Sequence, residues 1–396
     1  MVGVEVDVDV NTVLAAVRDI VPRLRVNGLD AENRRRLPEE NLNLLEQAGV
    51  LRMATPKHYG GLDFSLADQA KVLAEIARGC GSTSWVTMVW VSSAWICSLY
   101  PEELQRDIFT TSSPRISGGF MPTGKLTPVD GGYRLTGTWR FNSGCQDADW
   151  NMLLALLERP DGSVEEAIAM VPLSECTIVD DWHASALAAT GSCTTTLEDV
   201  VVPAHRVVIP SEAATAMAEH PELLAALPPG RTYSLYPFLF SQAVSTFTGL
   251  ARGAYELFVD RLPGRGISYT SWTEQQEHPV TQIQVGTAAA KIAAAEALAT
   301  EMYRLQQQRA DLGEEPTFEE RVAIRGQSAY AVQLAKEAVE VLFQAAGATA
   351  IRRDLPLQRF RRDIEGLSLH GWIVLNSNME VYGRALLGMD PGTQML

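Results

Sequence analysis

The sequence predicts an α+β protein of more than one domain, in which a strand-rich middle lies between two helical ends. Near both ends apolar residues recur every three or four positions, whereas between residues 117 and 210 the period falls towards two. The chain of 396 residues is also longer than a single hydrophobic core usually supports. We therefore expect three domains, at residues 1–115, 116–212 and 213–396.

The first domain is expected to be helical between residues 11 and 109. Three amphipathic segments carry start and stop signals such as proline, serine or acids at the beginning and glycine at the end (11–24, 38–51 and 65–81). Residues 83–100 are apolar on nearly every side, which predicts a buried helix. The alternating residues 1–10 are expected to be a frayed tail.

The middle domain is expected to be a compact antiparallel β-barrel or sandwich. Its apolar segments are short, rich in β-branched and aromatic residues, and separated by Gly, Asp and Pro (132–141, 150–158, 165–173, 176–182 and 193–203). From Tyr236 to Leu387 the helical period returns, and the alanine-rich segment 284–313 permits close helix approach. We expect a C-terminal four-helix bundle, joined to the barrel by a loop at residues 220–237.

Composition excludes several classes of partner. The net charge is −15, and the basic residues form no extended stripe, so we expect no nucleic-acid partner. The five cysteines show no CxxC pairing, which favours a reducing cytoplasm over a disulfide framework. No uncharged apolar stretch reaches membrane-spanning length, and the acidic N-terminus differs from a signal peptide, so we expect no membrane partner.

Common catalytic motifs are missing. The sequence has no GxGxxG after a strand, no phosphate-binding GxxxxGK[ST] loop and no GxSxG elbow. The six histidines are too widely spaced for an HExxH-type site, so no metal is expected. The residues by themselves indicate only that a ligand would favour the junction between barrel and helices.

Four segments in this order resemble a known family: "TPKHYGGLDFS" (55–65), residues 123–150 with "TGTWRFNSG", "TTTLEDVVVPAHRV" (194–207) and "GATAIRRDLPLQRFRRD" (347–363). They resemble the acyl-CoA dehydrogenase fold, and more closely its two-component, group D flavin-dependent monooxygenases. The resemblance implies that FMN or FAD, reduced by a separate NAD(P)H flavin reductase, reacts with O₂ to give a flavin hydroperoxide. It further implies a small-molecule substrate, in secondary metabolism such as antibiotic biosynthesis, and a cytoplasmic homotetramer.

The resemblance also assigns flavin-contacting residues at the junction of barrel and bundle. The ring would lie against an aromatic wall and a polar turn (Trp139, Phe141, Asn142 and Ser143). Thr190 and Ser192 would meet its pyrimidine edge or the substrate, and Gly347 and Thr349 a neighbouring subunit's flavin phosphates. From the residues alone, Trp139 and Phe141 are equally typical of a strand core, and Thr190 and Ser192 of a turn.

Missing acids favour oxygenation over dehydrogenation. An acyl-CoA dehydrogenase needs a carboxylate base, but the two positions that carry it in the family correspond here to His370–Gly371 and to Ser245–Thr246. On a continuous helix, Glu365 would point about 140° away from His370. The resemblance therefore assigns catalysis to His370, which faces the ring in the monooxygenases, together with Ser143.

The substrate pocket departs from the aromatic hydroxylases of the family. Ser93 stands where they carry a histidine, and serine cannot deprotonate a phenol as imidazole does. Trp90, Ser92 and Ser93 are the expected substrate contacts, and the identity of the substrate stays open. Three alternatives also stay open: an N-oxygenase of the nitrososynthase type acting on a nucleotide-linked amino sugar, an acyl-CoA dehydrogenase, and a non-catalytic scaffold of the same fold.

Overall fold

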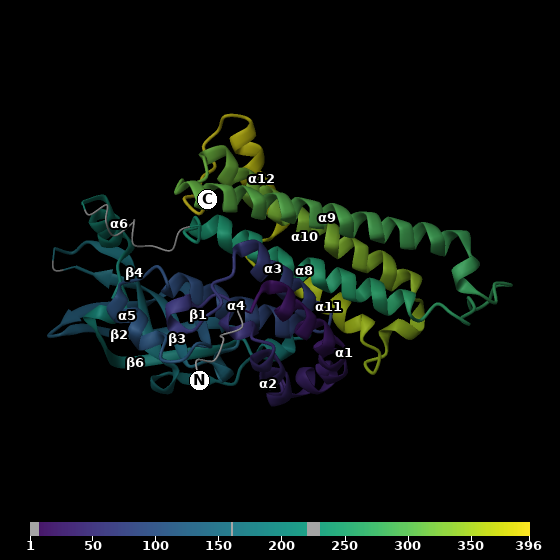
Figure 1. Ribbon diagram of the computed structural model, residues 1–396, viewed down its shortest axis with the longest axis horizontal. Coiled ribbons are helices and arrows are strands. Elements are labelled where there is room, and N and C mark those ends of the chain that lie inside the picture. The colour runs from purple at the N-terminus through teal and green to yellow at the C-terminus, as the bar shows by residue number, and fades with distance from the viewer. Residues whose placement is uncertain (1–7, 160, 220–229) are drawn as a thin grey trace, which may run out of the picture.

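The computed structural model describes residues 8–159, 161–219 and 230–396. A twisted sheet lies at one end of the molecule, long helices extend from it, and the N-terminal helices pack beside both (Figure 1). Most of the expected N-terminal tail and part of the expected loop at 220–237 lie outside the described residues.

The N-terminal part is helical, as predicted: α1 (Val10–Arg34), α2 (Glu39–Gln47), α3 (Leu66–Ala77), α4 (Gly81–Cys97) and α5 (Glu102–Ile108). The Ser65 side chain caps α3 by accepting a hydrogen bond from the Asp68 N–H. Nearly every residue of α4 is buried, because this helix packs against the sheet on one side and against α8 (Leu235–Val259) on the other. The predicted buried helix is therefore confirmed.

The middle of the chain forms one seven-stranded sheet in the order β5-β6-β2-β1-β3-β4-β7. Its strands are β1 (Ile116–Val129), β2 (Gly132–Asn142), β3 (Trp150–Glu158), β4 (Val164–Pro172), β5 (Thr177–Val179), β6 (Cys193–Pro203) and β7 (Val207–Val208). The prediction of a purely antiparallel sheet was wrong for one pair, since β1 and β3 are parallel. After β2 the chain crosses β1 through residues 143–149, so β3 pairs with the far edge of β1 in the same direction.

Trp139 belongs to the core of the sheet, which corrects its assignment to a flavin wall. Its side chain is completely buried among sheet residues, and its indole Nε1 donates to the Leu154 carbonyl at 2.8 Å. Gly119, Gly124 and Gly137 leave room for the ring, because a Cβ atom at any of them would clash with it. The simple interpretation of strand alternation therefore applies to Trp139.

The C-terminal bundle consists of α8, α9 (Pro279–Leu312), α10 (Phe318–Ala345), α11 (Leu357–Leu367) and α12 (Leu375–Leu386), preceded by α6 (Pro210–Glu219). Figure 1 shows α9 and α10 side by side along the length of the bundle. The expected continuous helix through His370 was wrong, because α11 ends at Leu367 and α12 begins at Leu375. No helix in the described ranges combines the length and apolarity needed to cross a bilayer.

The basic run at the end of α1 serves to join the helices to the sheet domain. Arg35 pairs with Asp180 at 2.6 Å, and Arg36 pairs with Asp147 at 2.5 Å. Arg362 of α11 pairs with Glu32 of α1 at 2.9 Å. These contacts position the segments around residues 146 and 180, which flank the turns described next.

Candidate functional site

The turn after β2, residues 143–146, lies against the buried helix α4. Gly144 adopts a left-handed conformation with φ of 72°, and a Cβ atom there would approach Val86 to 2.6 Å and the Trp90 indole nitrogen to 2.9 Å. Glycine is needed here for both its conformation and its size. The turn thereby holds Ser143, which is 8% exposed, against α4.

Three buried hydroxyls form a chain beside this turn. Ser143 Oγ lies 2.8 Å from Ser192 Oγ, and Ser192 Oγ lies 2.6 Å from Thr190 Oγ1. Thr190 Oγ1 donates to the Leu187 carbonyl at 2.8 Å. The structure thus brings together the two polar turns that the sequence analysis singled out separately.

Trp85 of α4 links the hydroxyl chain to His370. Its Nε1 donates to Ser143 Oγ at 3.2 Å, and its ring lies edge-on to the His370 ring with centroids 5.4 Å apart. Trp372 packs edge-on against the same imidazole at 5.3 Å, and Phe120 lies 5.6 Å from Trp372. His370 therefore lies between aromatic rings, at the break between α11 and α12.

The imidazole of His370 is neutral near pH 7. Burial lowers its pKa to about 4, and no charged group opposes that effect. Its Nδ1 accepts a hydrogen bond from the Trp372 backbone N–H at 3.3 Å, so the ring proton lies on Nε2. The side chain can therefore offer a ligand one neutral N–H donor.

A pH-dependent stability follows from this pKa. The folded chain holds His370 with a pKa of about 4, whereas an unfolded histidine titrates near 6.5, so the unfolded chain takes up the proton first as the pH falls. Stability from the neutral ring is complete above pH 6.5 and is lost towards pH 4. We expect wild type to lose about 2 kcal/mol more than His370→Asn between pH 7 and 4.5. Urea unfolding of both proteins at the two pH values measures this, and parallel losses would contradict the assigned pKa.

Both family positions for a catalytic carboxylate lack an acid. Ser245 donates to the Gln242 carbonyl and Thr246 contacts Ser84, so both are buried inside the helix packing. Glu365 is exposed and lies 3.6 Å from Lys336. The expectation that Glu365 points away from His370 stays a prediction, because the continuous helix from which it was derived does not exist.

Phe141 and Asn142 differ sharply in their surroundings. Phe141 is 70% exposed and meets Trp182 edge-on, and its φ of 60° means that a strained backbone holds this ring at the surface. Asn142 is fully buried, and its Nδ2 donates to Asn151 and Thr195. Contact of either residue with flavin stays a prediction.

The expected substrate contacts on α4 separate into two groups. Ser92 hydrogen-bonds to Gln242, which in turn donates to Gln69, so the protein itself satisfies this hydroxyl. Trp90 Nε1 and Ser93 Oγ are buried without a hydrogen-bond partner. Buried polar groups rarely stay unsatisfied, so these two atoms suit a polar ligand better than Ser92 does.

Two further orphaned oxygens lie beside the same turns, namely Asn142 Oδ1 and Gln146 Oε1. A Cβ atom at Gly191 would lie 2.9 Å from the Gln146 oxygen, which places that amide against the second turn. Three buried polar atoms without a hydrogen-bond partner thus lie at or against residues 142–146 and 191, namely Trp90 Nε1, Asn142 Oδ1 and Gln146 Oε1. The residues present therefore fit a ligand that carries several polar ring atoms.

Gly347 and Thr349 lie apart from this cluster. Both are exposed in the turn that follows α10, and Figure 1 shows this end of α10 at the end of the bundle away from the sheet. Thr349 Oγ1 accepts hydrogen bonds from Arg261 and Arg265, each at 2.9 Å. The structure therefore does not bring these two residues to Ser143, and instead surrounds them with guanidinium groups.

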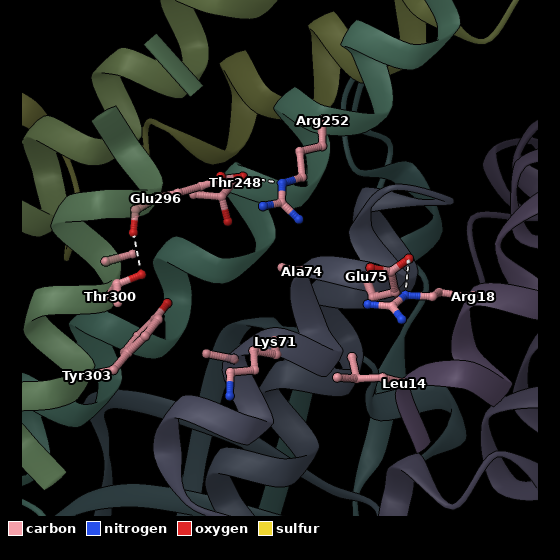
Figure 2. A pocket seen from close by; sticks show the side chains of 12 residues that line it. Leu14, Arg18, Lys71, Ala74, Glu75, Thr248, Arg252, Glu296, Thr300 and Tyr303 are labelled. Carbon is pink, nitrogen blue, oxygen red and sulfur yellow. Dashed lines mark hydrogen bonds and ion pairs between the residues drawn. The ribbon is translucent and has the colours of Figure 1, made fainter. Parts of the chain in front are cut away.

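A separate cavity of about 200 Å³ lies between α1, α3, α8 and α9 (Figure 2). Its charges are paired, with Arg252 joined to Glu296 and Arg18 to Glu75. None of the predicted site residues lines it. We therefore place the candidate site at the hydroxyl chain and His370.

Comparisons with known proteins match this architecture. The acyl-CoA dehydrogenase N-terminal domain model matches residues 11–109, and the C-terminal domain model matches residues 242–374. The FADH(2)-dependent resorcinol hydroxylase oxygenase component of Rhizobium sp. is 30% identical, over 96% of this chain and 94% of that relative. The chain belongs to the flavin-dependent monooxygenases of the acyl-CoA dehydrogenase fold.

Solved structures agree with this membership. XiaF from Streptomyces sp., in complex with FADH2 and glycerol, superposes with a TM-score of 0.90 at 28% identity and covers 98% of each chain. The HsaA monooxygenase from M. tuberculosis gives a TM-score of 0.89 at 28% identity, over 98% of this chain and 100% of that one. This monooxygenase is therefore an oxidoreductase, the oxygenase component of a two-component system that uses reduced flavin and O₂.

The sequence analysis missed two residues of the candidate site. The sequence did not distinguish Trp85 from Trp90 and Trp95. In the structure the Trp95 ring stacks on Phe238 with centroids 3.8 Å apart, and of the three tryptophans only Trp85 contacts His370. Asp363 accepts the Leu187 N–H at 2.7 Å, and burial raises its pKa to about 6. Asp363 is the last residue of the quoted segment 347–363, which was a signal for it, whereas no local pattern distinguishes Trp85.

Proposed function

We propose that the flavin ring lies between the Ser143 turn and His370, where this protein uses it to oxygenate an electron-rich aromatic small molecule. The observation that carries the proposal is the contact of Trp85 with both residues: its indole donates to Ser143 Oγ and packs edge-on against the His370 ring. Reduced flavin, when bound, supplies the electrons that activate O₂. The chain supplies the His370 Nε2–H donor, the Ser143 oxygen and walls that exclude water.

An aromatic substrate is supported by the lining near His370. Trp372 and Phe120 offer apolar ring surface, and no carboxylate partner of His370 is present among the described residues. Ser93 Oγ, buried and unpartnered, would bond a polar substituent of the substrate. A serine hydroxyl is too weak a base to remove the proton of a phenol, so we propose that the aromatic substrate reacts in its uncharged form.

The experiment loads the protein anaerobically with reduced FAD, adds a panel of phenols and indoles, and then admits O₂. Mass spectrometry should find one added oxygen atom on carbon in at least one aromatic product. An oxygenated nitrogen from a nucleotide-linked amino sugar would replace this proposal with the N-oxygenase alternative. Bleaching of bound oxidised flavin by an acyl-CoA thioester would indicate a dehydrogenase, and the absence of flavin binding would indicate a scaffold.

We propose FAD rather than FMN, with its phosphates reaching Gly347 and Thr349 of a neighbouring subunit. Arg261 and Arg265 converge on the Thr349 hydroxyl, and guanidinium groups suit the two phosphates of FAD. We expect the double variant Arg261→Gln/Arg265→Gln to weaken FAD binding at least tenfold, because charged hydrogen bonds are lost.

The matched control for this pair is Arg304→Gln, since among the described residues Arg304 hydrogen-bonds with Glu301 and Gln308 of its own helix. Fluorescence titration of FAD at two salt concentrations measures the effect. Equal affinity in wild type and the double variant would remove this turn from the flavin site.

We also propose a cytoplasmic homotetramer acting on a secondary-metabolite intermediate, as in antibiotic biosynthesis. All five cysteines are free thiols, which suits a reducing compartment. The exposed face of α9 is rich in small residues that allow close contact with another helix (Ala290, Ala293, Ala294 and Ala297). The domain boundaries after residues 115 and 212 are part of the same proposal, and sedimentation analysis tests the tetramer.

A further inference from the structure

The hydrogen bonds of the hydroxyl chain (Ser143, Ser192 and Thr190) all donate in one direction, because the group at each end of the chain can act in only one way. At one end, the Leu187 carbonyl can only accept, so the single proton of Thr190 Oγ1 is used there. At the other end, the Trp85 indole nitrogen can only donate, so it occupies a lone pair of Ser143 Oγ.

The direction of each intermediate bond follows from these ends. Thr190 has no proton left, so Ser192 must donate to it over 2.6 Å. Ser192 then has no proton left, so Ser143 must donate to Ser192 over 2.8 Å. The three side chains are only 2–8% exposed, so bulk water does not reverse the order. Ser143 keeps one free lone pair and no free proton.

From this geometry we infer that Ser192 and Thr190 are positioning residues that make Ser143 an acceptor, and so make the site select reduced over oxidised flavin. The inference rests on the proposed flavin site. Reduced flavin carries a proton on N5 and needs an acceptor, whereas N5 of oxidised flavin has a lone pair and needs a donor. Thr190 and Ser192 therefore act through Ser143 rather than by touching the ring.

The neighbouring groups support this division of roles. His370 offers a neutral Nε2–H, so the two sides of the site differ in kind, one donating and one accepting. Asp363 holds the Leu187 N–H, which fixes the backbone segment whose carbonyl anchors the chain. The Leu187 carbonyl also accepts from Trp182 Nε1 at 3.1 Å, so it stays satisfied if the Thr190 hydroxyl is removed.

The decisive variant is Thr190→Val, which keeps the side-chain shape and removes the hydroxyl that donates to the Leu187 carbonyl. Ser192 can then donate to Ser143, and Ser143 can present its proton to the ligand. Anaerobic titration with reduced and with oxidised FAD should show that wild type prefers reduced FAD. In Thr190→Val the ratio of the two dissociation constants should fall about tenfold. Part of that fall should come from tighter binding of oxidised FAD, a gain that structural damage does not produce.

Three further variants serve as controls. Thr190→Ser should retain the wild-type ratio of dissociation constants. Trp85→Phe should still prefer reduced FAD, because the hydrogen bond from Thr190 to the Leu187 carbonyl still sets the direction of the chain. Thr248→Val removes a buried hydroxyl bonded to Ser245, away from the site, and should leave the ratio unchanged. An unchanged ratio in Thr190→Val, or equal weakening of both redox states, overturns the inference. Failure of wild type to bind either form would instead overturn the proposed flavin site.

Discussion

Replacing His370 with alanine should make oxidised flavin reappear about 10²-fold faster after reduced enzyme meets O₂, with H₂O₂ released instead of product. The physical reason is the loss of the neutral Nε2–H donor from a site shielded by Trp85 and Trp372. Stopped-flow absorbance follows the flavin, and a peroxidase-coupled assay follows H₂O₂.

The control for this variant is His58→Ala, since His58 is an exposed histidine outside the site. The pH profile adds a second check. Because burial lowers the pKa of His370 to about 4, the rate should show no histidine inflection near pH 6.5. A reoxidation rate equal to that of wild type would remove His370 from the reaction.

Replacing Trp139 with alanine should lower the free energy of unfolding by about 3–5 kcal/mol. The indole is fully buried, and glycines on β1 and β2 leave the space that it fills, so its removal would open a cavity. The Leu154 carbonyl would also lose the hydrogen bond that the indole Nε1 donates. Urea denaturation of the flavin-free protein measures the change. Any loss of flavin affinity should follow the loss of folded protein.

The control for this variant is Trp272→Ala, in which a partly exposed tryptophan is removed. We expect that change to cost less than about 1 kcal/mol. If Trp139→Ala instead left stability within 1 kcal/mol of wild type and weakened flavin binding alone, Trp139 would belong to the cofactor site after all.

The succession of helices, strands and helices could be read from the sequence because periodicity is a local property. The segments 150–158 and 193–203 were predicted as strands and coincide with β3 and β6. Residues 83–100 were recognised as a buried helix because apolar side chains cover every face of α4. The resemblance of four ordered segments then identified the family, and the comparisons support it.

What surrounds each side chain was decided only by the tertiary structure. Alternation places Trp139 on one face of a strand, but only the packed sheet shows that this face is the core. The break between α11 and α12 lies in a segment that contains Gly366 and Gly371, but only the tertiary structure shows that it puts His370 between two aromatic rings. The direction of the hydroxyl chain depends on contacts among α4, the turn after β2 and the segment before β6, which are distant in sequence. Hydrogen-bond donors and acceptors are assigned by neighbours in space, and a linear pattern does not contain them.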